Sequence, residues 1–320
     1  MKILFVTSTR IGDAVLSTGL LSHLVSHFPE AQITVASGML PAPLFERVPG
    51  VVRVISLTKQ AFAGHWLGLW AEVARTAWDL VVDLRGSALA WTVVTRKRRV
   101  FRRGDDSLHR VEALAGLFDL QAAPSPRLWR SEADEAEACR LIVSGSPVLA
   151  LGPTANWAAK IWPANSFVAL LERLTGPQGI LSGARVAVFG GPGERDIAQP
   201  VLDAIPRERC INLIGVVDLP VVAACLRRCA LFIGNDSGLM HMSAAVGTPT
   251  LGLFGPSQAK HYAPWGAHCA VAETEISYDD LVGDPAFDHR ATDSLMQSLP
   301  VETVVRETEA LWRRHSGEAA

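Results

Sequence analysis

The segment from Leu231 to Pro256 contains the residue types that could bind a phosphorylated ligand. A short apolar run, typical of a strand, is followed by Asn-Asp-Ser-Gly, which supplies loop and helix N-cap chemistry. A helix-compatible stretch then ends at Gly247-Thr248-Pro249. The start of a helix carries free N–H groups and a partial positive charge, so it suits an anion such as a diphosphate. Asp236 and His241 flank that point with groups that can bind hydroxyls, and the pattern indicates a phosphate-bearing sugar donor.

Two further loops, each after a predicted strand, carry candidate polar residues. Lys160 lies among apolar neighbours in Gly152–Pro163, where a lysine can neutralise a phosphate as a point charge. A solvated loop lysine is the commoner case. The glycine-rich segment Phe189–Glu194 lets the backbone approach a ligand closely, and Glu194 could hydrogen-bond a ribose. A plain connecting loop explains that segment equally well.

Asp13 comes directly after the first predicted strand and its loop, Ser8–Gly12. Open α/β sheets bind ligands beyond the carboxyl ends of their strands, so this loop is a natural place for a site. The start of the following helix would keep Asp13 ionised and able to accept a proton from an attacking hydroxyl. An ordinary N-cap aspartate is the commoner explanation of this pattern.

Six cations lie close together in Arg96-Lys-Arg-Arg99 and Arg102-Arg103. They could hold an anionic acceptor or contact the anionic inner leaflet of a membrane, although a solvated loop is the default. No aromatic ladder interrupts them, so we expect no nucleic-acid partner. His23 and His27 share a helix face but lack an evident third ligand. We therefore expect neither a metal site nor a cofactor.

The composition limits the class of protein. The 320 residues are 49% hydrophobic and 19% charged, with a net charge of −2, which is typical of a folded protein of two domains. No apolar run approaches the roughly 18 residues of a membrane span. The apolar run at the start is short, from Ile3 to Val6, and indicates a first strand rather than a signal peptide. Five scattered cysteines without a CxxC pair favour a reducing, cytoplasmic location.

Strand-like runs alternate with helix-length segments, which predicts parallel α/β units. The predicted strands are Ile3–Thr7, Gln32–Ala36, Val52–Ser56, Leu80–Leu84, Val148–Leu151, Arg185–Phe189, Cys210–Asn212, Leu231–Gly234 and Thr250–Phe254. The predicted helices are Asp13–His27, His65–Ala77, Asn165–Leu174, Gly193–Ala204, Leu219–Arg228 and Met240–Val246. A turn-rich stretch, Ser144–Pro147, predicts domains over 1–145 and 146–300. A last helix over 301–315 is expected to pack back across that boundary.

Taken in order, several segments resemble the ADP-heptose:lipopolysaccharide heptosyltransferases, glycosyltransferase family 9. The main matching segments are Gly234-Asn-Asp-Ser-Gly-Leu-Met-His241, Ala244-Ala-Val-Gly-Thr-Pro249, Phe254-Gly-Pro256, Asn212-Leu-Ile-Gly215, Lys160-Ile-Trp-Pro163, Arg10-Ile-Gly-Asp13 and Asp79–Gly86. The resemblance runs over nearly the whole chain and implies a GT-B fold, with two Rossmann-like α/β/α domains facing across a cleft. The first domain would bind the acceptor and the second the nucleotide-sugar donor.

The resemblance also implies residue roles. Asp13 would be the catalytic base. The donor would be held by Thr154, Asn156, Lys160, Glu194, Asp236, Ser237, Gly238, Leu239 and His241. The acceptor would be held by Arg10, Arg96, Arg99, Arg102 and Arg103. Ile161 stands where many relatives have arginine, and residues 274–298 match no pattern and receive no role.

The implied reaction moves heptose from ADP-heptose to a lipopolysaccharide core acceptor in one inverting step. No DxD-type acidic pair is present where a metal would bridge the diphosphate, so we expect metal independence. The enzyme would work in the cytoplasm, at the inner face of the membrane. Three alternatives stay open: another glycan or protein acceptor, a sugar-nucleotide epimerase, and a non-catalytic nucleotide-sugar binding protein.

Overall fold

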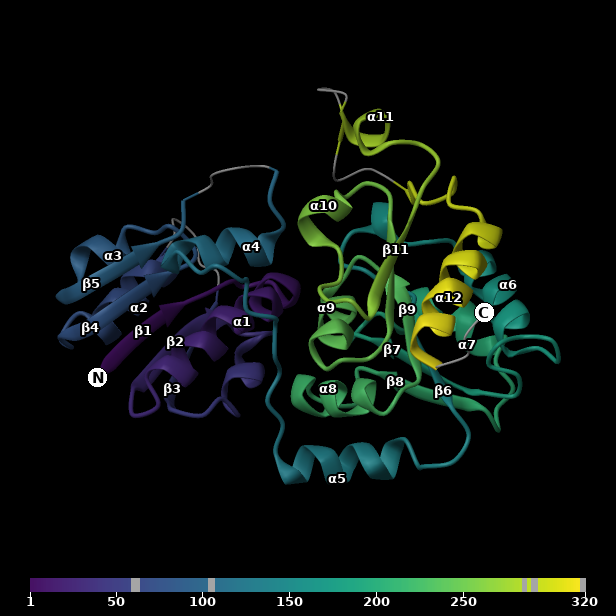
Figure 1. Cartoon of the computed structure of the whole chain (residues 1–320), viewed down its shortest axis with the longest axis horizontal. Helices are drawn as coiled ribbons and strands as arrows, with labels where there is room; N and C mark the ends of the chain where they lie inside the picture. The colour runs from purple at the N-terminus through teal and green to yellow at the C-terminus, as the bar shows by residue number, and fades with distance from the viewer. Residues whose placement is uncertain (59–63, 103–106, 284–286, 289–292, 317–320) are drawn as a thin grey trace. The chain divides into compact units, whose positions relative to one another are not determined.

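The chain forms two compact units in a computed structural model that describes residues 1–58, 64–102, 107–283, 287–288 and 293–316 (Figure 1). The units are Met1–Ser131 and Glu132–Ala320. The division therefore comes before the turn-rich stretch at Ser144–Pro147, and the boundary expected near residue 145 is one helix too late.

The helix that follows the division explains this difference. This helix, α5 (Glu132–Leu141), packs against α8 (Leu219–Arg227) of the second unit. Just after α8, Arg228 donates from Nε to the carbonyl oxygen of Ile142 (2.8 Å). Turn residues mark where the chain bends, whereas these contacts decide to which unit a helix belongs.

The first unit is a five-stranded parallel sheet covered by helices on both faces. Its elements are β1 (Lys2–Val6), α1 (Ile11–His27), β2 (Gln32–Gly38), η1 (Ala42–Phe45), β3 (Val51–Leu57), α2 (Gly64–Val73), β4 (Trp78–Asp83), α3 (Leu89–Thr92), β5 (Thr95–Val100), α4 (Arg110–Ala115) and η3 (Gly116–Phe118). The strand order is β3-β2-β1-β4-β5. All four neighbouring pairs are parallel.

The central strand β1 shows why the sequence folds this way. Ile3 and Phe5 are fully buried in the core under α1, and Leu4 and Val6 are fully buried in the core under α2 and α3. A strand buried on both faces reads as a continuous apolar run, which is the pattern of parallel α/β sheets.

The basic segment Thr95–Val100 is a strand, β5, and not the loop expected from its charges. It pairs in parallel with β4, from Trp78 opposite Thr95 to Asp83 opposite Val100. Because β5 is at the edge of the sheet, its side chains can stay largely exposed to solvent. Its sequence therefore lacks the alternation of apolar and polar residues by which a strand is usually recognised. Cationic side chains also discourage pairing of an exposed sheet edge with another chain.

The second unit is a six-stranded parallel sheet with the order β11-β10-β9-β6-β7-β8. Besides α5 and α8, its elements are β6 (Val148–Gly152), η4 (Ala158–Lys160), α6 (Ala164–Thr175), β7 (Arg185–Gly190), α7 (Arg195–Asp203), β8 (Cys210–Ile214), β9 (Leu231–Asn235), α9 (Gly238–Ala245), β10 (Thr250–Phe254), α10 (Ala259–Tyr262), β11 (Cys269–Glu273), α11 (Tyr278–Val282) and α12 (Val301–Ser316). In Figure 1, α6, α7 and α12 cover one face of this sheet and α8 and α9 the other. The edge strand β11 was not predicted, since it is half-buried and lacks a continuous apolar run.

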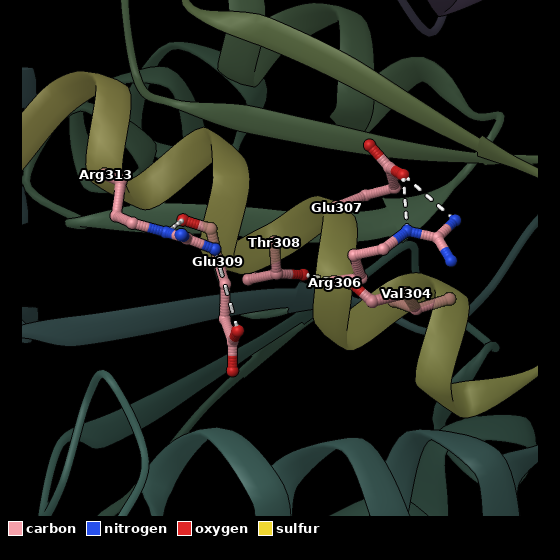
Figure 2. A network of polar contacts seen from close by, with 6 residues as sticks. All are labelled: Val304, Arg306, Glu307, Thr308, Glu309 and Arg313. Carbon is pink, nitrogen blue, oxygen red and sulfur yellow. Dashed lines mark hydrogen bonds and ion pairs between the residues drawn. The ribbon is translucent and has the colours of Figure 1, made fainter. Parts of the chain in front are cut away.

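The terminal helix α12, which was expected to pack back on the first unit, belongs to the second unit and packs there against α6 and β11. Its apolar side is buried in the core through Val304, Val305 and Leu311. Figure 2 shows the polar contacts of the same helix: the hydroxyl of buried Thr308 donates to the carbonyl oxygen of Val304 (2.6 Å). The figure also shows two surface ion pairs, Arg306–Glu307 and Arg313–Glu309, and a hydrogen bond from Nε of Arg313 to the carbonyl oxygen of Glu309 (3.2 Å). Such pairs contribute about 0–1 kcal/mol, so apolar burial decides where α12 packs.

Three properties of the described residues bear on function. None of the helices there combines the length and apolar character that a membrane crossing requires. No group of three or more His, Cys, Asp or Glu side chains there is arranged to hold a metal ion. All five cysteines are free, and burial raises the pKa of Cys225 and of Cys269 to about 12. These two thiols therefore stay protonated at neutral pH and are poor nucleophiles.

Candidate functional site

The strand order of the second unit creates a switch point between β6 and β9, where a ligand site is expected. The chain proceeds from β6 to β7 and β8 on one side and resumes with β9 on the other side of β6. At such a switch point the two following loops diverge, and ligands of open α/β sheets bind in that crevice beyond the carboxyl ends of the strands. The loop after β6 carries Thr154, Asn156 and Lys160, and the loop after β9 carries Asp236 and Ser237.

Glycines allow these two strands to end in close contact. Gly152 of β6 lies opposite Gly234 of β9. A Cβ atom on Gly234 would lie 2.8 Å from the carbonyl oxygen of Gly152, and one on Gly152 would lie 2.8 Å from the ring of Phe232. Any side chain at either position would therefore displace backbone or core atoms at the base of the site.

Lys160 forms an ion pair with Asp236 across the switch point. The Nζ–Oδ2 distance is 2.5 Å, and the side chains are 21% and 7% exposed. The other oxygen of Asp236, Oδ1, lies 3.8 Å from Nε2 of His241, which is buried on α9. The structure thus brings three of the expected donor-binding residues together. Lys160 is not the solvated loop lysine that its surroundings in the sequence favoured.

The loop that carries Lys160 is fixed by residues that the sequence analysis did not assign. Trp162 is fully buried; its backbone N–H donates to Oδ1 of Asn235, and its indole Nε1 donates to the carbonyl oxygen of Leu299 (3.0 Å each). The hydroxyl of Ser294 donates to the carbonyl oxygen of Ile161 (2.6 Å). Residues 294–299, which include part of the stretch left without a role, therefore position the lysine. Only the long-range fold reveals this contribution.

The start of α9 offers hydrogen-bond donors next to this ion pair. Ser237 is the N-cap residue with an extended backbone, so the first N–H groups of α9 point out of the helix end. Within the described part of the chain, Ser237 Oγ and Nδ2 of the fully buried Asn235 have no hydrogen-bond partner. Buried polar atoms are normally satisfied, so these two indicate a polar ligand at this position. Gly238 and Leu239, the other expected residues, form the first turn.

A second pair forms between the loops after β6 and β7. The hydroxyl of Thr154 donates to Oε2 of Glu194 (2.7 Å), and the backbone N–H of Gly191 donates to the same oxygen (2.6 Å). Glu194 is thereby held in place with Oε1 available as an acceptor for a hydroxyl. Asn156 lies exposed in the same loop, outside these contacts.

In the first unit the strand order reverses between β1 and β4, and Asp13 lies in the first turn of α1, the helix that follows β1. The helix α1 begins at Ile11 with Arg10 as its N-cap residue, so Asp13 is not the N-cap aspartate of the alternative explanation. Its Oδ2 accepts a hydrogen bond from the hydroxyl of Ser8 (3.4 Å), and its side chain is half-buried. The carboxylate therefore lies at the N-terminal turn of α1, where helix polarity favours a negative charge.

The cations expected to bind the acceptor do not all lie together. Arg10 and Arg102 follow the carboxyl ends of β1 and β5, near the Asp13 end of the sheet, and Arg99 lies near the end of β5, with its guanidinium 5.7 Å from the ring of Phe118. Arg96 is at the opposite end of β5, where it pairs with Asp79 (3.5 Å). The structure thus separates Arg96 from the other three. Arg103 lies outside the described residues.

The comparisons with known proteins agree with this architecture. The model of glycosyltransferase family 9 (heptosyltransferase) matches residues 84–279. The chain is 26% identical to a lipooligosaccharide heptosyltransferase 2 of Haemophilus influenzae over 82% of this chain and 86% of that protein. It is 25% identical to the lipopolysaccharide heptosyltransferase 2 of Escherichia coli K12, over 97% and 98% of the two chains.

Solved structures show the same fold. The structure of an E. coli ADP-heptose lipopolysaccharide heptosyltransferase II superimposes with a TM-score of 0.77, covering 100% of both chains at 23% identity. An E. coli heptosyltransferase solved with ADP gives a TM-score of 0.72, with 97% and 100% coverage at 17% identity. The predicted GT-B class, with two parallel-sheet α/β domains, is confirmed. The family model covers more than half of the chain, and the chain therefore belongs to glycosyltransferase family 9 and is a glycosyltransferase.

Proposed function

We propose that this enzyme transfers heptose from ADP-heptose to an acceptor in the core of lipopolysaccharide and inverts the anomeric configuration. The observation that carries the donor side is the Lys160–Asp236 ion pair, which lies beside the start of α9 at the switch point of the second sheet. The acceptor class is supported by the names of the similar proteins, which act on lipopolysaccharide or lipooligosaccharide. We propose the second unit as the donor-binding domain and the first as the acceptor-binding domain.

In this proposal each donor-binding residue has a distinct task. The ammonium of Lys160 and the N–H groups of Gly238 and Leu239 bind the diphosphate. Ser237 adds a hydroxyl donor at the same helix end. The heptose hydroxyls contact Asp236 and His241, and the ribose hydroxyls bind Glu194, whose orientation is fixed by Thr154. Asn156 lines the phosphate side of the same loop.

Asp13 is proposed as the general base of a single displacement. Its carboxylate takes the proton of the acceptor hydroxyl, and the acceptor oxygen forms a bond to the anomeric carbon. The bond from that carbon to the diphosphate oxygen breaks at the same time, and ADP leaves with the electron pair. Attack opposite the leaving group inverts the anomeric centre. Lys160 and the start of α9 stabilise the charge that develops on ADP, which is the work a metal would otherwise do.

A donor screen tests this proposal. ADP-heptose is expected to raise the melting temperature of the protein more than UDP-, GDP- or dTDP-sugars do, and to do so equally with EDTA present. Product analysis with donor alone then separates the classes: an epimerase would change the sugar without an acceptor, and a binding protein would leave the donor intact. A preference for another nucleotide would reject ADP-heptose as donor, and loss of turnover in EDTA would reject metal independence.

We also propose that β5 contacts the inner leaflet of the cytoplasmic membrane, where a lipid-linked acceptor is presented. The exposed apolar residues Trp91 and Val94 lie next to this strand, 54% and 67% exposed, and the guanidinium of Arg98 lies 4.9 Å from the Trp91 ring centre. An exposed tryptophan beside several cations fits the interface of an anionic bilayer.

Arg98→Gln is expected to weaken binding to vesicles that contain anionic phospholipid by about fivefold, since one cation near such a surface contributes about 1 kcal/mol. The measurement is vesicle co-flotation, with purely zwitterionic vesicles as the baseline. Arg207→Gln, an exposed arginine of the second unit, is the matched control. Equal binding of Arg98→Gln and wild type to the anionic vesicles would reject this surface.

A further inference from the structure

The loop after β4, Leu84–Ser87, is fixed by a buried carboxylate that the proposed function does not use. Asp83 is fully buried. It accepts hydrogen bonds from the backbone N–H groups of Arg85 and Ser87 (2.8 Å each) and from the hydroxyl of Ser87 (2.6 Å). Burying a carboxylate is costly unless hydrogen bonds compensate it. Here all three hydrogen bonds come from Arg85 and Ser87, so they fix the conformation of this one short loop.

The middle of this loop requires glycine. Gly86 has a φ of +62°, and a Cβ atom there would lie 2.8 Å from the carbonyl oxygen of Phe101. The backbone N–H of Phe101 in turn donates to the carbonyl oxygen of Asp83 (2.8 Å). The loop is therefore held by Asp83 on one side and by the chain leaving β5 on the other, and the backbone at Arg85 is fixed.

Arg85 is presented beside the loop that leads to Asp13. Its Nη1 donates to the hydroxyl of Thr9 (3.4 Å). Thr9 is 76 residues away in the sequence but lies next to Arg85 in space, because β1 and β4 are neighbouring strands. Gly38, the last residue of β2, also approaches Thr9: a Cβ atom on Gly38 would lie 2.5 Å from Cα of Thr9. The ends of three adjacent strands thus converge on Thr9.

Among the described residues, two cations at this convergence have no ion-pair partner. Arg10 and Arg85 are both exposed, and no carboxylate of the described residues lies within ion-pair distance of either guanidinium. The neighbouring charge is the catalytic candidate Asp13, which by itself would repel an acidic acceptor. A guanidinium binds carboxylate and phosphate groups through two parallel hydrogen bonds, so it can both attract and orient such a group.

We propose that Arg85 binds an acidic group of the acceptor, a carboxylate or a phosphate, and orients the attacking hydroxyl next to Asp13. Arg10 is the second cation of this site, and Asp83 is a positioning residue that acts through the loop. This inference rests on the proposed function, because it takes Asp13 as the base. It assigns Arg85 a role in recognition of the acceptor and none in binding of the donor.

The test uses the full chain and the oligosaccharide released by deacylation of heptose-deficient lipopolysaccharide. Arg85→Gln is expected to raise both the Kd and the KM for this oligosaccharide by at least about tenfold, since two charge-assisted hydrogen bonds are lost. The melting-temperature shift with ADP is expected to be unchanged. Arg85→Lys, which keeps the charge but not the planar fork, is expected to recover part of the loss.

Controls separate recognition from a structural effect. Arg75→Gln, at an exposed arginine of the same unit, should leave Kd and KM at the wild-type values. A neutral acceptor is made by reducing the carboxyl groups of the oligosaccharide and removing its phosphates. Wild type and Arg85→Gln should have the same Kd and KM for this neutral acceptor. An equal loss by the variant on the charged and the neutral acceptor, or no loss on the charged one, would overturn the proposal.

The two proposals fail in different ways. If wild type transfers heptose and Arg85→Gln binds the acidic oligosaccharide normally, only the role of Arg85 is rejected. If wild type makes no heptosyl product while binding of the acidic oligosaccharide depends on Arg85, the transferase proposal is rejected and the anion site stands. Failure of wild type to bind the oligosaccharide at all rejects the site.

Discussion

Asp13→Asn is expected to lower turnover about 100- to 10,000-fold, the range over which a positioned general base accelerates proton transfer. The amide keeps the size of the side chain and its contact with the hydroxyl of Ser8, so the fold of the first unit should be preserved. Since the carboxylate lies in the unit that does not hold the donor in our proposal, the melting-temperature shift with ADP-heptose should match that of wild type. The measurements are single-turnover transfer rates and donor-induced thermal shifts.

The same substitution elsewhere on the sheet provides the control. Asp79 lies near the start of β4, at the end of the sheet opposite Asp13, where its Oδ2 accepts a hydrogen bond from the backbone N–H of Lys2 (2.8 Å) and its carboxylate pairs with Arg96. Asp79→Asn should transfer heptose at close to the wild-type rate. Turnover of Asp13→Asn within a few fold of wild type, with donor binding intact, would remove Asp13 as the base.

Lys160→Gln is expected to reduce turnover about 100- to 1,000-fold, the cost of losing one preorganised group that stabilises developing negative charge. Affinity for ADP should fall as well, because the ammonium would contact the diphosphate in the ground state too. Both effects follow from its position: it is largely buried and fixed against Asp236 rather than free in solvent. ADP affinity by calorimetry and transfer rates with saturating donor separate the two contributions.

A double variant distinguishes this role from a purely structural one. Lys160→Gln alone leaves Asp236 buried without its cation, and breaking one partner of a buried ion pair costs about 3–5 kcal/mol of stability. Lys160→Gln with Asp236→Asn removes both charges and should recover most of the melting temperature without recovering transfer. Lys260→Gln, at an exposed lysine of α10, should match wild type in both assays. Recovery of transfer in the double variant would show that Lys160 acts only through the fold.

The candidate site was partly readable from local sequence. Asn235-Asp-Ser-Gly238 begins at the last residue of the buried strand β9, and α/β ligand sites form at the loops that follow the ends of parallel strands. The same reasoning found the positions of Asp13 and Lys160. Local pattern alone, however, favoured an ordinary N-cap aspartate for Asp13 and a solvated loop lysine for Lys160. It did not find the roles of Ser294, Asn235 or Asp83, because a serine, an asparagine or an aspartate becomes informative only through the hydrogen-bond partners that the folded chain gives it.

The sequence by itself determined which segments become buried strands. The apolar runs of β1, β6, β9 and β10 are more stable when removed from water, whatever the topology of the chain. It did not determine β5, whose basic residues form a strand only because β4 offers an unpaired edge. Nor did it determine the pairing of Lys160 with Asp236, the place of α12 or the division after Ser131. Each of these depends on contacts between residues far apart in the chain, and such contacts arise only when the sheets assemble.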